Sequence, residues 1–362
     1  MNESPINPLH RKRGAQMGAE HGWYMPQQFT NLAEEHRASR AACGLFDISH
    51  LSKIRVVGNG ALAWLEGLLS NRISRCLDGF GQHTLLLRDD GSIIDRLILF
   101  RESAGRFFLL GHASMEQTVL DWLHRHRPDG PLEVQNLTRK RSGIALSGPD
   151  SIRILRRVLQ SRELPPPMGI LRTMLMGEEL ILTHAGIAGR PGYELFCPAA
   201  SGIRFYEDFF RAGATPCGSS TRETLRLEQA SPDTAHDLRH ANTPVRAGLE
   251  CYCDLTKNYP GSETLHAQRM EGTPKMLAAL ECETKEATPR RGDSVTDEDG
   301  HTVGSITSGA FSPGLGHSVA LAYLLNRLCR PGTHLRIRMR GQSVPAIVRT
   351  PPDAEQKPYD EK

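Results

Sequence analysis

The sequence has no long apolar run and no regular cysteine pattern, and each absence excludes a class of protein. No segment reaches the ~18 consecutive apolar residues that a membrane-spanning helix needs, and residues 1–13 lack the apolar stretch of a secretory signal. The eight cysteines include no C-x-x-C pair, unlike those of a disulfide scaffold or a structural zinc site. Cys251 and Cys253 suit either a metal or two free thiols, and their apolar setting favours free thiols. We therefore expect a cytoplasmic protein that does not associate with a membrane.

The chain also has little excess charge of either sign. Its formal net charge is +3 over 362 residues, which gives no reason to expect a nucleic-acid partner. The basic cluster Arg11–Arg13 is interpreted as a solvated terminus rather than a binding patch. With 39% hydrophobic and 23% charged residues, the composition is that of a folded globular protein, and the length suits two or three domains.

Motifs of several common enzyme classes are missing. The sequence contains no phosphate-binding P-loop, no G-x-G-x-x-G after a strand, no G-x-S-x-G elbow and no H-E-x-x-H. Several histidines of the first third fit no metal-ligand spacing: His21, His36, His50, His83 and His112. No metal site is therefore expected.

Hydrophobic periodicity predicts mixed helices and strands within residues 1–270. Apolar residues at near-helical spacing predict helices over Ala61–Leu69 and Met115–His124. Short β-rich runs predict strands over Thr84–Leu87, Ile93–Phe100, Phe107–Leu110, Gly143–Leu146 and Glu179–Thr183. The turn-forming sequence Asp89-Asp90-Gly91 should join the first two of these strands.

A small antiparallel β domain is expected over residues 271–350. Runs with Gly and Pro punctuation predict its strands: Ala278–Cys282, Val303–Thr307, Ser318–Leu324, Leu335–Met339 and Val344–Val348. The charged, proline-containing segment 351–362 is interpreted as a flexible tail.

Asp95 is the most informative single position. It lies within Ile93–Phe100, an otherwise mostly apolar run typical of a strand buried on both faces. Because burying an unpartnered carboxylate is costly, Asp95 must face a partner or a cavity. Its neighbour Arg96 points to the opposite face of the strand and cannot easily be that partner. The local pattern also allows pairing with a distant cation, or a partly exposed edge strand.

A second carboxylate, Glu194, follows a segment in which two glycines flank Arg190 and Pro191. The tight turn expected there places Glu194 near the start of a strand, where it can face a ligand held close to the backbone of Gly192. A carboxylate accepts paired N–H donors, so the ring of a pterin or a guanine would suit it. The alternative is a solvated glutamate on an ordinary strand.

Ser220 and Glu223 fit a capping box and predict the start of a helix that continues over 223–229. Arg222 and Arg226 lie four residues apart on this helix and would repel each other unless an anion lies near them. Either the two arginines face a bound anion, or they pair with acidic residues of the same helix.

Taken together, several segments resemble the glycine cleavage T-protein (aminomethyltransferase) family. Their order and spacing match from about Gly14 to Val348. The matching segments are His21–Pro26, Cys43–Leu51, the Gly-rich turn with the Ile94-Asp95 strand, Ser147–Pro149, Gly192–Glu194, Arg222–Glu228 and Ile306–Pro313.

The resemblance implies an α+β fold of three domains in a cloverleaf-like arrangement around a channel for tetrahydrofolate. Residues 1–270 would form a folate-binding core of two interleaved α+β domains, and residues 271–350 a small C-terminal β-barrel. It assigns Asp95 as the catalytic aspartate beside the folate nitrogens, where a fixed carboxylate stabilises a cationic, iminium-like one-carbon unit. It assigns Glu194 to the pterin, Arg222 to the neighbourhood of that site, and Arg290 to the anionic folate tail. Three further positions are assigned to cofactor binding: Tyr193, His83 and His112.

The sequence departs from the family pattern where side chains would line the channel. Residues 233–237 read Asp-Thr-Ala-His-Asp, where many members have Leu-Tyr-Gly-His/Gln-Glu. Other positions differ too: His83 and Ile187 stand where tyrosines are common, Arg88 and His112 where asparagines are common, and Arg96 where a second aspartate is found.

Three functions remain open on this basis. The working hypothesis is transfer of an aminomethyl group from a lipoylated carrier protein to tetrahydrofolate, with the net positive charge suiting an acidic carrier. The second is a folate-dependent demethylase or methyltransferase of the same fold, taking a methyl group from sulfur, oxygen or nitrogen. The third is a non-catalytic folate-binding protein that supports iron–sulfur enzymes. It is disfavoured because Lys257–Glu263 lacks the cysteine of such relatives and because Asp95 is kept.

Overall fold

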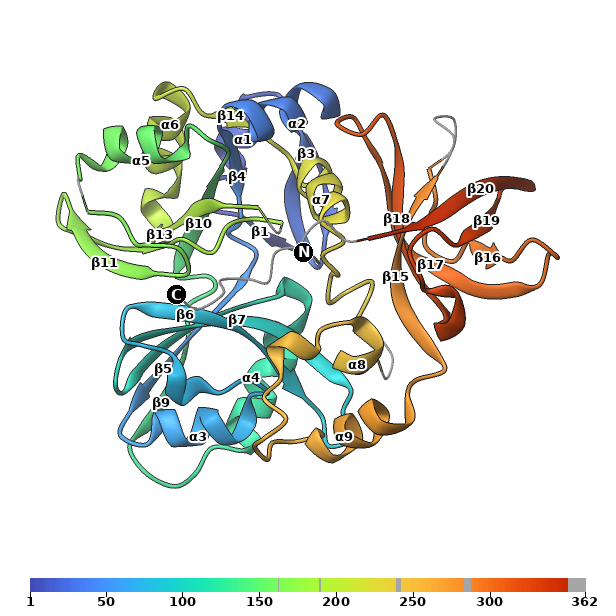
Figure 1. Ribbon diagram of the computed structural model, residues 1–362. Helices are drawn as coiled ribbons and strands as arrows, with labels where there is room; N and C mark the ends of the chain where they lie inside the picture. The colour runs from blue at the N-terminus through green and yellow to red at the C-terminus, as the bar shows by residue number, and fades with distance from the viewer. Residues whose placement is uncertain (162, 189, 239–241, 283–287, 351–362) are drawn as a thin grey trace.

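The computed structural model describes residues 1–161, 163–188, 190–238, 242–282 and 288–350. Two mixed α/β lobes and a β-barrel surround helix α7 (Ser219–Glu228), so that the molecule has the cloverleaf-like outline seen in Figure 1. The α+β fold with a C-terminal antiparallel β domain is the one that the sequence predicts. The tail expected at 351–362 lies outside the described residues.

The first lobe is built on a six-stranded sheet in the order β11-β12-β13-β10-β4-β14. These strands are β4 (Gly44–Asp47), β10 (Arg141–Ser147), β11 (Ile170–Leu175), β12 (Glu178–Thr183), β13 (Gly192–Pro198) and β14 (Thr215–Pro216). Helices α5 (Ser151–Leu159) and α6 (Gly202–Arg211) cover one face of the sheet. Phe205 and Phe209 of α6 are buried in the core between helices and sheet, together with Leu195 of β13.

The second lobe contains a five-stranded antiparallel sheet in the order β6-β7-β8-β5-β9. Its strands are β5 (Ser52–Gly58), β6 (Phe80–Leu87), β7 (Ile93–Ser103), β8 (Arg106–Gly111) and β9 (Leu132–Asn136). Helices α3 (Ala61–Leu68) and α4 (Glu116–Arg125) bury their apolar residues against one face. The predicted turn after Leu87 joins β6 and β7, and the predicted helices and strands of this lobe are confirmed with longer strands than expected.

The uncovered faces of the two sheets pack against each other. One apolar cluster contains Phe100 and Phe108 of the second sheet with Ile181 and Phe196 of the first, and the rings of Phe108 and Phe196 meet edge to face at 5.4 Å. Because strand residues alternate in direction, Glu194 shares with Phe196 the face of β13 that looks toward the second sheet. The sheet pairing thus places Glu194 between the two lobes.

Short elements at the N-terminus fill the space beside α7. These are α1 (Asn7–Lys12), α2 (Leu32–Ala41) and a three-stranded sheet of β1 (Asn2–Glu3), β3 (Trp23–Gln28) and β2 (Gln16–Glu20). Both β3 and α2 contact α7. Residues of the N-terminal segment therefore lie next to the helix that carries Arg222.

The capping-box prediction for α7 is wrong. The helix begins at Ser219, and no side chain of its own first turn caps it. Instead, the fully buried carboxylate of Glu35 in α2 accepts hydrogen bonds from the N–H of Gly218 and the hydroxyl of Thr221, both at 2.8 Å. A Cβ atom on Gly218 would lie 2.0 Å from the carbonyl oxygen of Gln27, so no side chain fits there. The cap is a tertiary contact, which a local motif cannot reveal.

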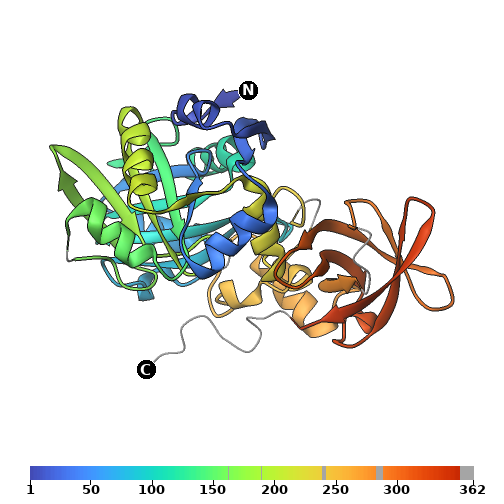
Figure 2. The ribbon, with the colours of Figure 1, turned by 90° about the horizontal axis from the view of Figure 1, so that it is seen from above.

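Six antiparallel strands form a closed barrel at the C-terminal end, in the order β15-β18-β17-β16-β19-β20. They are β15 (Lys275–Cys282), β16 (Ser294–Thr296), β17 (Thr302–Ser312), β18 (His317–Leu325), β19 (His334–Met339) and β20 (Gln342–Arg349). The five predicted strands are all present, and only the short β16 was missed. Figure 2 shows the barrel beside the two packed sheets rather than between them.

The described part of the segment that joins α7 to the barrel contains more helix than its polar sequence predicts. It contains α8 (Pro244–Ala247) and α9 (Ser262–Glu271), and its buried Leu238 and Leu265 pack against Leu85 and Leu87 of β6. All eight cysteines are free thiols, and Cys251 is exposed rather than in the apolar setting expected for it. Within the described ranges, no helix combines the length and the apolar character needed to cross a membrane.

Candidate functional site

Glu194 presents an unpartnered carboxylate oxygen to the space between the lobes. The residue is 4% exposed, and its Oε2 accepts hydrogen bonds from the hydroxyl of Thr183 at 2.5 Å and the N–H of Ala185 at 3.2 Å. Its Oε1 is buried and has no hydrogen-bond partner in the part of the chain that the structure describes. Buried polar atoms are normally paired, so a lone oxygen of this kind marks a place where a ligand donor fits.

Burial also raises the pKa of Glu194 to about 8, although the hydrogen bonds from Thr183 and Ala185 act in the opposite direction. At neutral pH the side chain is therefore mostly a neutral acid until N–H donors approach Oε1 and favour its ionised form. A ring with adjacent N–H groups would supply those donors.

The backbone around Glu194 is fixed by close packing. β13 begins at Gly192, where a Cβ atom would lie 2.4 Å from the carbonyl oxygen of Leu146 on the neighbouring strand β10. Glycine is therefore required for the strand to pair from its first residue. Tyr193 points to the other face, where it lies in the core under α5 and α6 and stacks on His184 at 4.1 Å. The structure does not bring Tyr193 to the same face as Glu194.

Arg222 lies on α7 beside a second group of unpaired polar atoms. Its guanidinium donates to Oε1 of Glu20 at 2.5 Å, and the other Glu20 oxygen is buried without a partner among the described residues. Both ring nitrogens of the buried His50 likewise lack a hydrogen bond within the described residues, and Nε2 lies 3.8 Å from Glu20. Burial and the nearby charge of Arg222 keep the pKa of His50 well below its usual range, so this imidazole is neutral.

Glu20 and His50 were not identified as site residues from the sequence. Each is an isolated polar residue in its own segment, and only the packing of the N-terminal strands on α7 brings them together. The expected repulsion between Arg222 and Arg226 does not arise, because Arg226 is paired separately with Glu223 and with Asp237, the latter at 2.8 Å.

Asp95 lies on β7, between β6 and β8 of the second sheet, and is completely buried. Its Oδ1 accepts hydrogen bonds from the N–H of Arg96 at 2.8 Å and the hydroxyl of Thr234 at 2.9 Å. Its Oδ2 accepts from the N–H of His112 at 2.9 Å. The guanidinium of Arg96 points elsewhere and donates to Ser231, as strand alternation predicts. Burial raises the pKa of Asp95 to about 6, against the effect of these donors and of the His112 ring.

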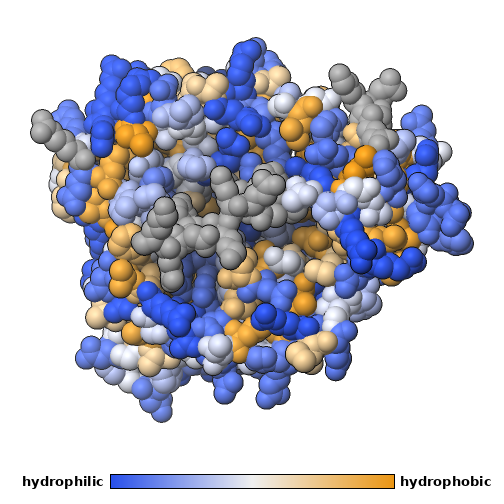
Figure 3. Space-filling view, in the orientation of Figure 1, coloured by the Kyte–Doolittle hydropathy of each residue, from blue (hydrophilic) through white to orange (hydrophobic). Residues whose placement is uncertain are grey.

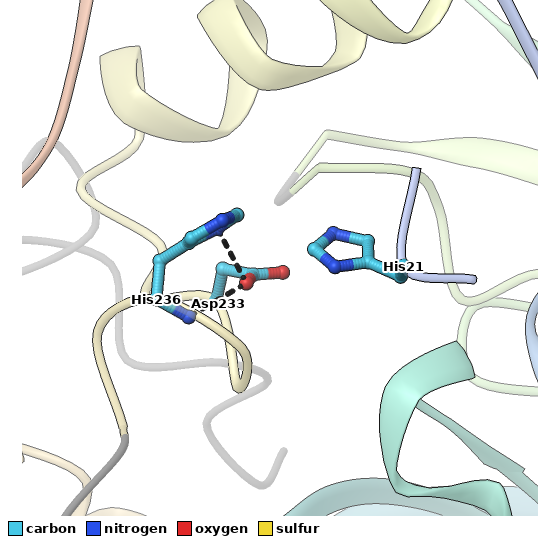
Figure 4. A group of neighbouring side chains, drawn as sticks. All are labelled: His21, Asp233 and His236. Atoms are coloured by element: carbon cyan, nitrogen blue, oxygen red, sulfur yellow. Dashed lines mark hydrogen bonds and ion pairs between the residues drawn. The ribbon is translucent and has the colours of Figure 1, made fainter. Parts of the chain in front are cut away.

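Next to Asp95 lies a cluster of polar side chains around Asp233. It includes His112, whose N–H binds Asp95, and it adjoins Thr234, whose hydroxyl binds Asp95. Nε2 of His112 lies 3.0 Å from Oδ2 of Asp233, and Nδ1 of His236 lies 3.0 Å from the other Asp233 oxygen. The ring of His21 packs against both imidazoles, with centroids 4.4 Å from His112 and 5.2 Å from His236. Figure 4 shows His21 approaching Asp233 from the side opposite His236. The cluster joins three segments of the chain around one carboxylate.

His83 and Arg290 lie apart from this cluster. His83 is on β6, with its ring 4.9 Å from that of Tyr252, and burial together with Arg96 lowers its pKa to about 3. Its Nδ1 is buried without a partner in the described residues. Arg290 is exposed in the loop before β16 of the barrel, where its N–H binds Asp293 at 2.7 Å. The structure brings neither into contact with Glu194.

Comparison with known proteins gives a consistent result along the whole chain. The GCVT N-terminal domain model matches residues 6–257, and the glycine cleavage T-protein C-terminal barrel domain model matches residues 275–353. The chain is 31% identical to the aminomethyltransferase of Nostoc sp. over 353 residues, which are 95% of this chain and 93% of that protein. It is also 31% identical to the aminomethyltransferase of Geobacillus kaustophilus over 356 residues, 96% of this chain and 97% of that one.

A solved structure extends this similarity to three dimensions. The glycine cleavage system aminomethyltransferase T from Bartonella henselae matches the fold with a TM-score of 0.92 at 27% identity. The match covers 99% of both chains, so the two lobes and the barrel correspond together rather than singly.

Proposed function

Because the chain belongs to the glycine cleavage T-protein family, we propose that it is a transferase that moves a one-carbon unit to tetrahydrofolate. The donor in this proposal is an aminomethyl group carried by a lipoylated carrier protein. The observation that carries the proposal is the buried, unpartnered Oε1 of Glu194, which faces the space between the two lobes. The relatives described as aminomethyltransferases supply the reaction class.

The chemistry of Glu194 suits the pterin ring of tetrahydrofolate. The ring edge carries adjacent N–H donors, and Oε1 has both lone pairs free to accept them. Hydrogen bonds between such donors and a carboxylate are stronger than neutral ones. Because the empty site holds Glu194 mostly protonated, ligand binding is coupled to loss of its proton.

We assign the charge that assists transfer to Asp95. A one-carbon unit that leaves sulfur as an iminium-like cation is stabilised by a fixed negative charge in a site without water. Asp95 is buried, and its three protein donors hold it in one orientation. With a pKa of about 6 it is mostly ionised at neutral pH despite its burial. The folate glutamates would be held by cations, for which Arg222 and Arg290 are the candidates.

The proposed carrier protein is expected to dock through charge. Arg88, Arg290 and Arg291 are exposed, and the face seen in Figure 3 is largely hydrophilic with small, scattered apolar patches. Such a surface suits a weak, salt-sensitive contact with an acidic partner.

Incubating the protein with tetrahydrofolate and an aminomethyl-loaded lipoylated carrier tests the reaction. The proposal predicts methylenetetrahydrofolate, with a rate that falls as salt is raised, and no product with the unlipoylated carrier. Absence of product at low salt, with folate binding intact, would exclude this donor.

A folate-dependent demethylase is the second candidate, because the cluster of His21, His112, Asp233 and His236 places polar groups next to Asp95 that suit a small polar substrate. Two of these four residues differ from the usual family pattern: His112 stands where an asparagine is common, and Asp233 where a leucine is common. Formation of methyltetrahydrofolate from a small methylated acid, without any carrier, would favour this candidate over the first.

A further inference from the structure

We propose that His21, Asp233 and His236 form a binding site for a divalent transition-metal ion of the zinc or iron class. One ligand atom from each residue can be chosen so that all three lie within 4.8 Å of one another. The inference concerns the metal alone and does not depend on folate binding or on the identity of the one-carbon donor.

The donor set is the first argument for a metal. Two imidazole nitrogens and one carboxylate oxygen are a combination used by catalytic zinc and by non-haem iron(II). Around zinc, metal–ligand bonds of about 2.0–2.2 Å require ligand atoms roughly 3.3 Å apart. Nδ1 of His236 and Oδ1 of Asp233 are already 3.0 Å apart, so only His21 has to move closer.

His21 has no competing role that would hold its ring in place. Its ring nitrogens have no hydrogen bond within the residues that the structure describes, and its only ring contacts are with the imidazoles of His112 and His236. A neutral imidazole that no hydrogen bond holds can turn a nitrogen lone pair toward a cation.

The carboxylate is oriented by groups outside the ligand set. Nδ1 of His112 accepts a hydrogen bond from the N–H of Ser114 at 3.2 Å, which fixes the direction of the ring. Its Nε2 lies 3.0 Å from Oδ2 of Asp233. The N–H of Ala235 donates to the other oxygen at 2.9 Å. Hydrogen-bonded carboxylates of this kind are typical of metal sites, where outer partners fix the direction of the ligand.

The proposed metal site lies next to Asp95, the residue to which we assign the charge that assists transfer. Asp233 is followed by Thr234, whose hydroxyl binds Asp95, and His112 binds Asp95 through its backbone N–H. Three protein ligands leave at least one position open on zinc or iron. An anionic group of a small substrate, or a water molecule, would occupy that position directly beside Asp95.

Titration of the full-length, chelator-treated protein with Co²⁺ tests the site, because Co²⁺ substitutes for both metal classes and its visible spectrum reports coordination. Parallel titrations with Zn²⁺ and with Fe²⁺ under anaerobic conditions show which class is preferred. The proposal predicts one bound ion per chain and a spectrum of low-coordinate Co²⁺. Binding should weaken as the pH falls, because protons compete for the imidazoles.

Two variants in separate segments identify the ligands. His21→Asn suits the left-handed backbone of this residue (φ 49°), and His236→Ala removes the half-buried partner. Each should weaken Co²⁺ binding at least about tenfold, since loss of even an outer partner commonly costs 10–100-fold. His301→Ala is the matched control, because His301 belongs to an exposed Asp/His group on the barrel.

Two results would overturn the proposal. One is the absence of Co²⁺ binding by the folded wild-type protein, and the other is binding that both site variants retain while the His301→Ala variant loses it. Circular dichroism and thermal unfolding of the metal-free variants establish that they are folded. Glu194→Ala should bind Co²⁺ as the wild type does, which separates this test from the test of folate binding.

Discussion

Glu194 and Asp95 are both buried strand carboxylates, one on each of the two packed sheets, but their oxygens are used differently. Glu194 has one oxygen bonded to protein donors and one without a partner among the described residues. Asp95 has both oxygens bonded, by three protein donors. An unpaired buried oxygen indicates a ligand, whereas a fully bonded carboxylate indicates a charge held in place. We therefore propose that Glu194 binds the ligand and that Asp95 assists the transfer.

The largest expected effect is on turnover, in Asp95→Asn. The substitution keeps the shape but removes the charge, so the rate of one-carbon transfer should fall about 10²-fold or more. One amide N–H would face a protein donor, so some stability is also lost, about 1–3 kcal/mol. Folate affinity should change little, because Asp95 is not assigned to the pterin.

Steady-state kinetics per folded molecule and calorimetry on the same sample separate these effects. Asp299→Asn, an exposed carboxylate of the barrel, serves as the control. If Asp95→Asn unfolds at a much lower temperature but retains its activity per folded molecule, Asp95 is structural and the comparison with Glu194 fails.

Glu194→Ala should mainly affect binding. Loss of the charged hydrogen bonds to the pterin is expected to weaken tetrahydrofolate affinity by about 1.5–3 kcal/mol. Isothermal titration calorimetry measures this directly. Glu133→Ala removes an exposed strand glutamate and should leave the affinity unchanged. Equal affinity in the Glu194→Ala variant and the wild type would remove the pterin assignment.

Thr234→Val should have the smallest effect, on stability. It removes one of the three donors to Asp95 while keeping the side-chain shape, which costs about 1.5 kcal/mol when the carboxylate is charged. Denaturant unfolding at several pH values measures the cost, with Thr118→Val on the exposed side of α4 as the control.

The pH dependence of this last variant has a definite sign. Burial raises the folded-state pKa of Asp95 to about 6, above its unfolded value, so the charged form destabilises the fold above that pH and the penalty disappears as the pH falls. The difference between Thr234→Val and the wild type should therefore be greatest above about pH 6 and shrink in acid. A difference that grows in acid would mean that Thr234 acts through another group.

The sequence predicts the local elements around the site better than the contacts between distant segments. The barrel strands, the β6–β7 hairpin and the buried setting of Asp95 follow from local apolar patterns, because alternation and turn residues are local properties. The cap of α7 by Glu35 could not be predicted in this way, and neither could the meeting of Glu20 with Arg222. The first contact joins residues 183 positions apart in the chain, and the second joins residues 202 positions apart.

The histidine cluster illustrates the same limit. His21, His112 and His236 fit no metal-ligand spacing along the chain, because ligand motifs are recognised only when several ligands share one element. Here each comes from a different segment, and only the folded chain brings their rings together around Asp233. The available signal was that residues 233–237 differ from the usual family pattern, which marks the position but not the partners.

The central claim, that Glu194 binds the pterin through its carboxylate, is tested most directly by proton release on folate binding. Near neutral pH, a group with a pKa of about 8 is mostly protonated in the empty site and must ionise to accept the ring N–H groups. Calorimetry in two buffers of different ionisation enthalpy should therefore show about one proton released per bound tetrahydrofolate in the wild type, and close to none in Glu194→Gln. Binding with equal proton release in both proteins would contradict the account.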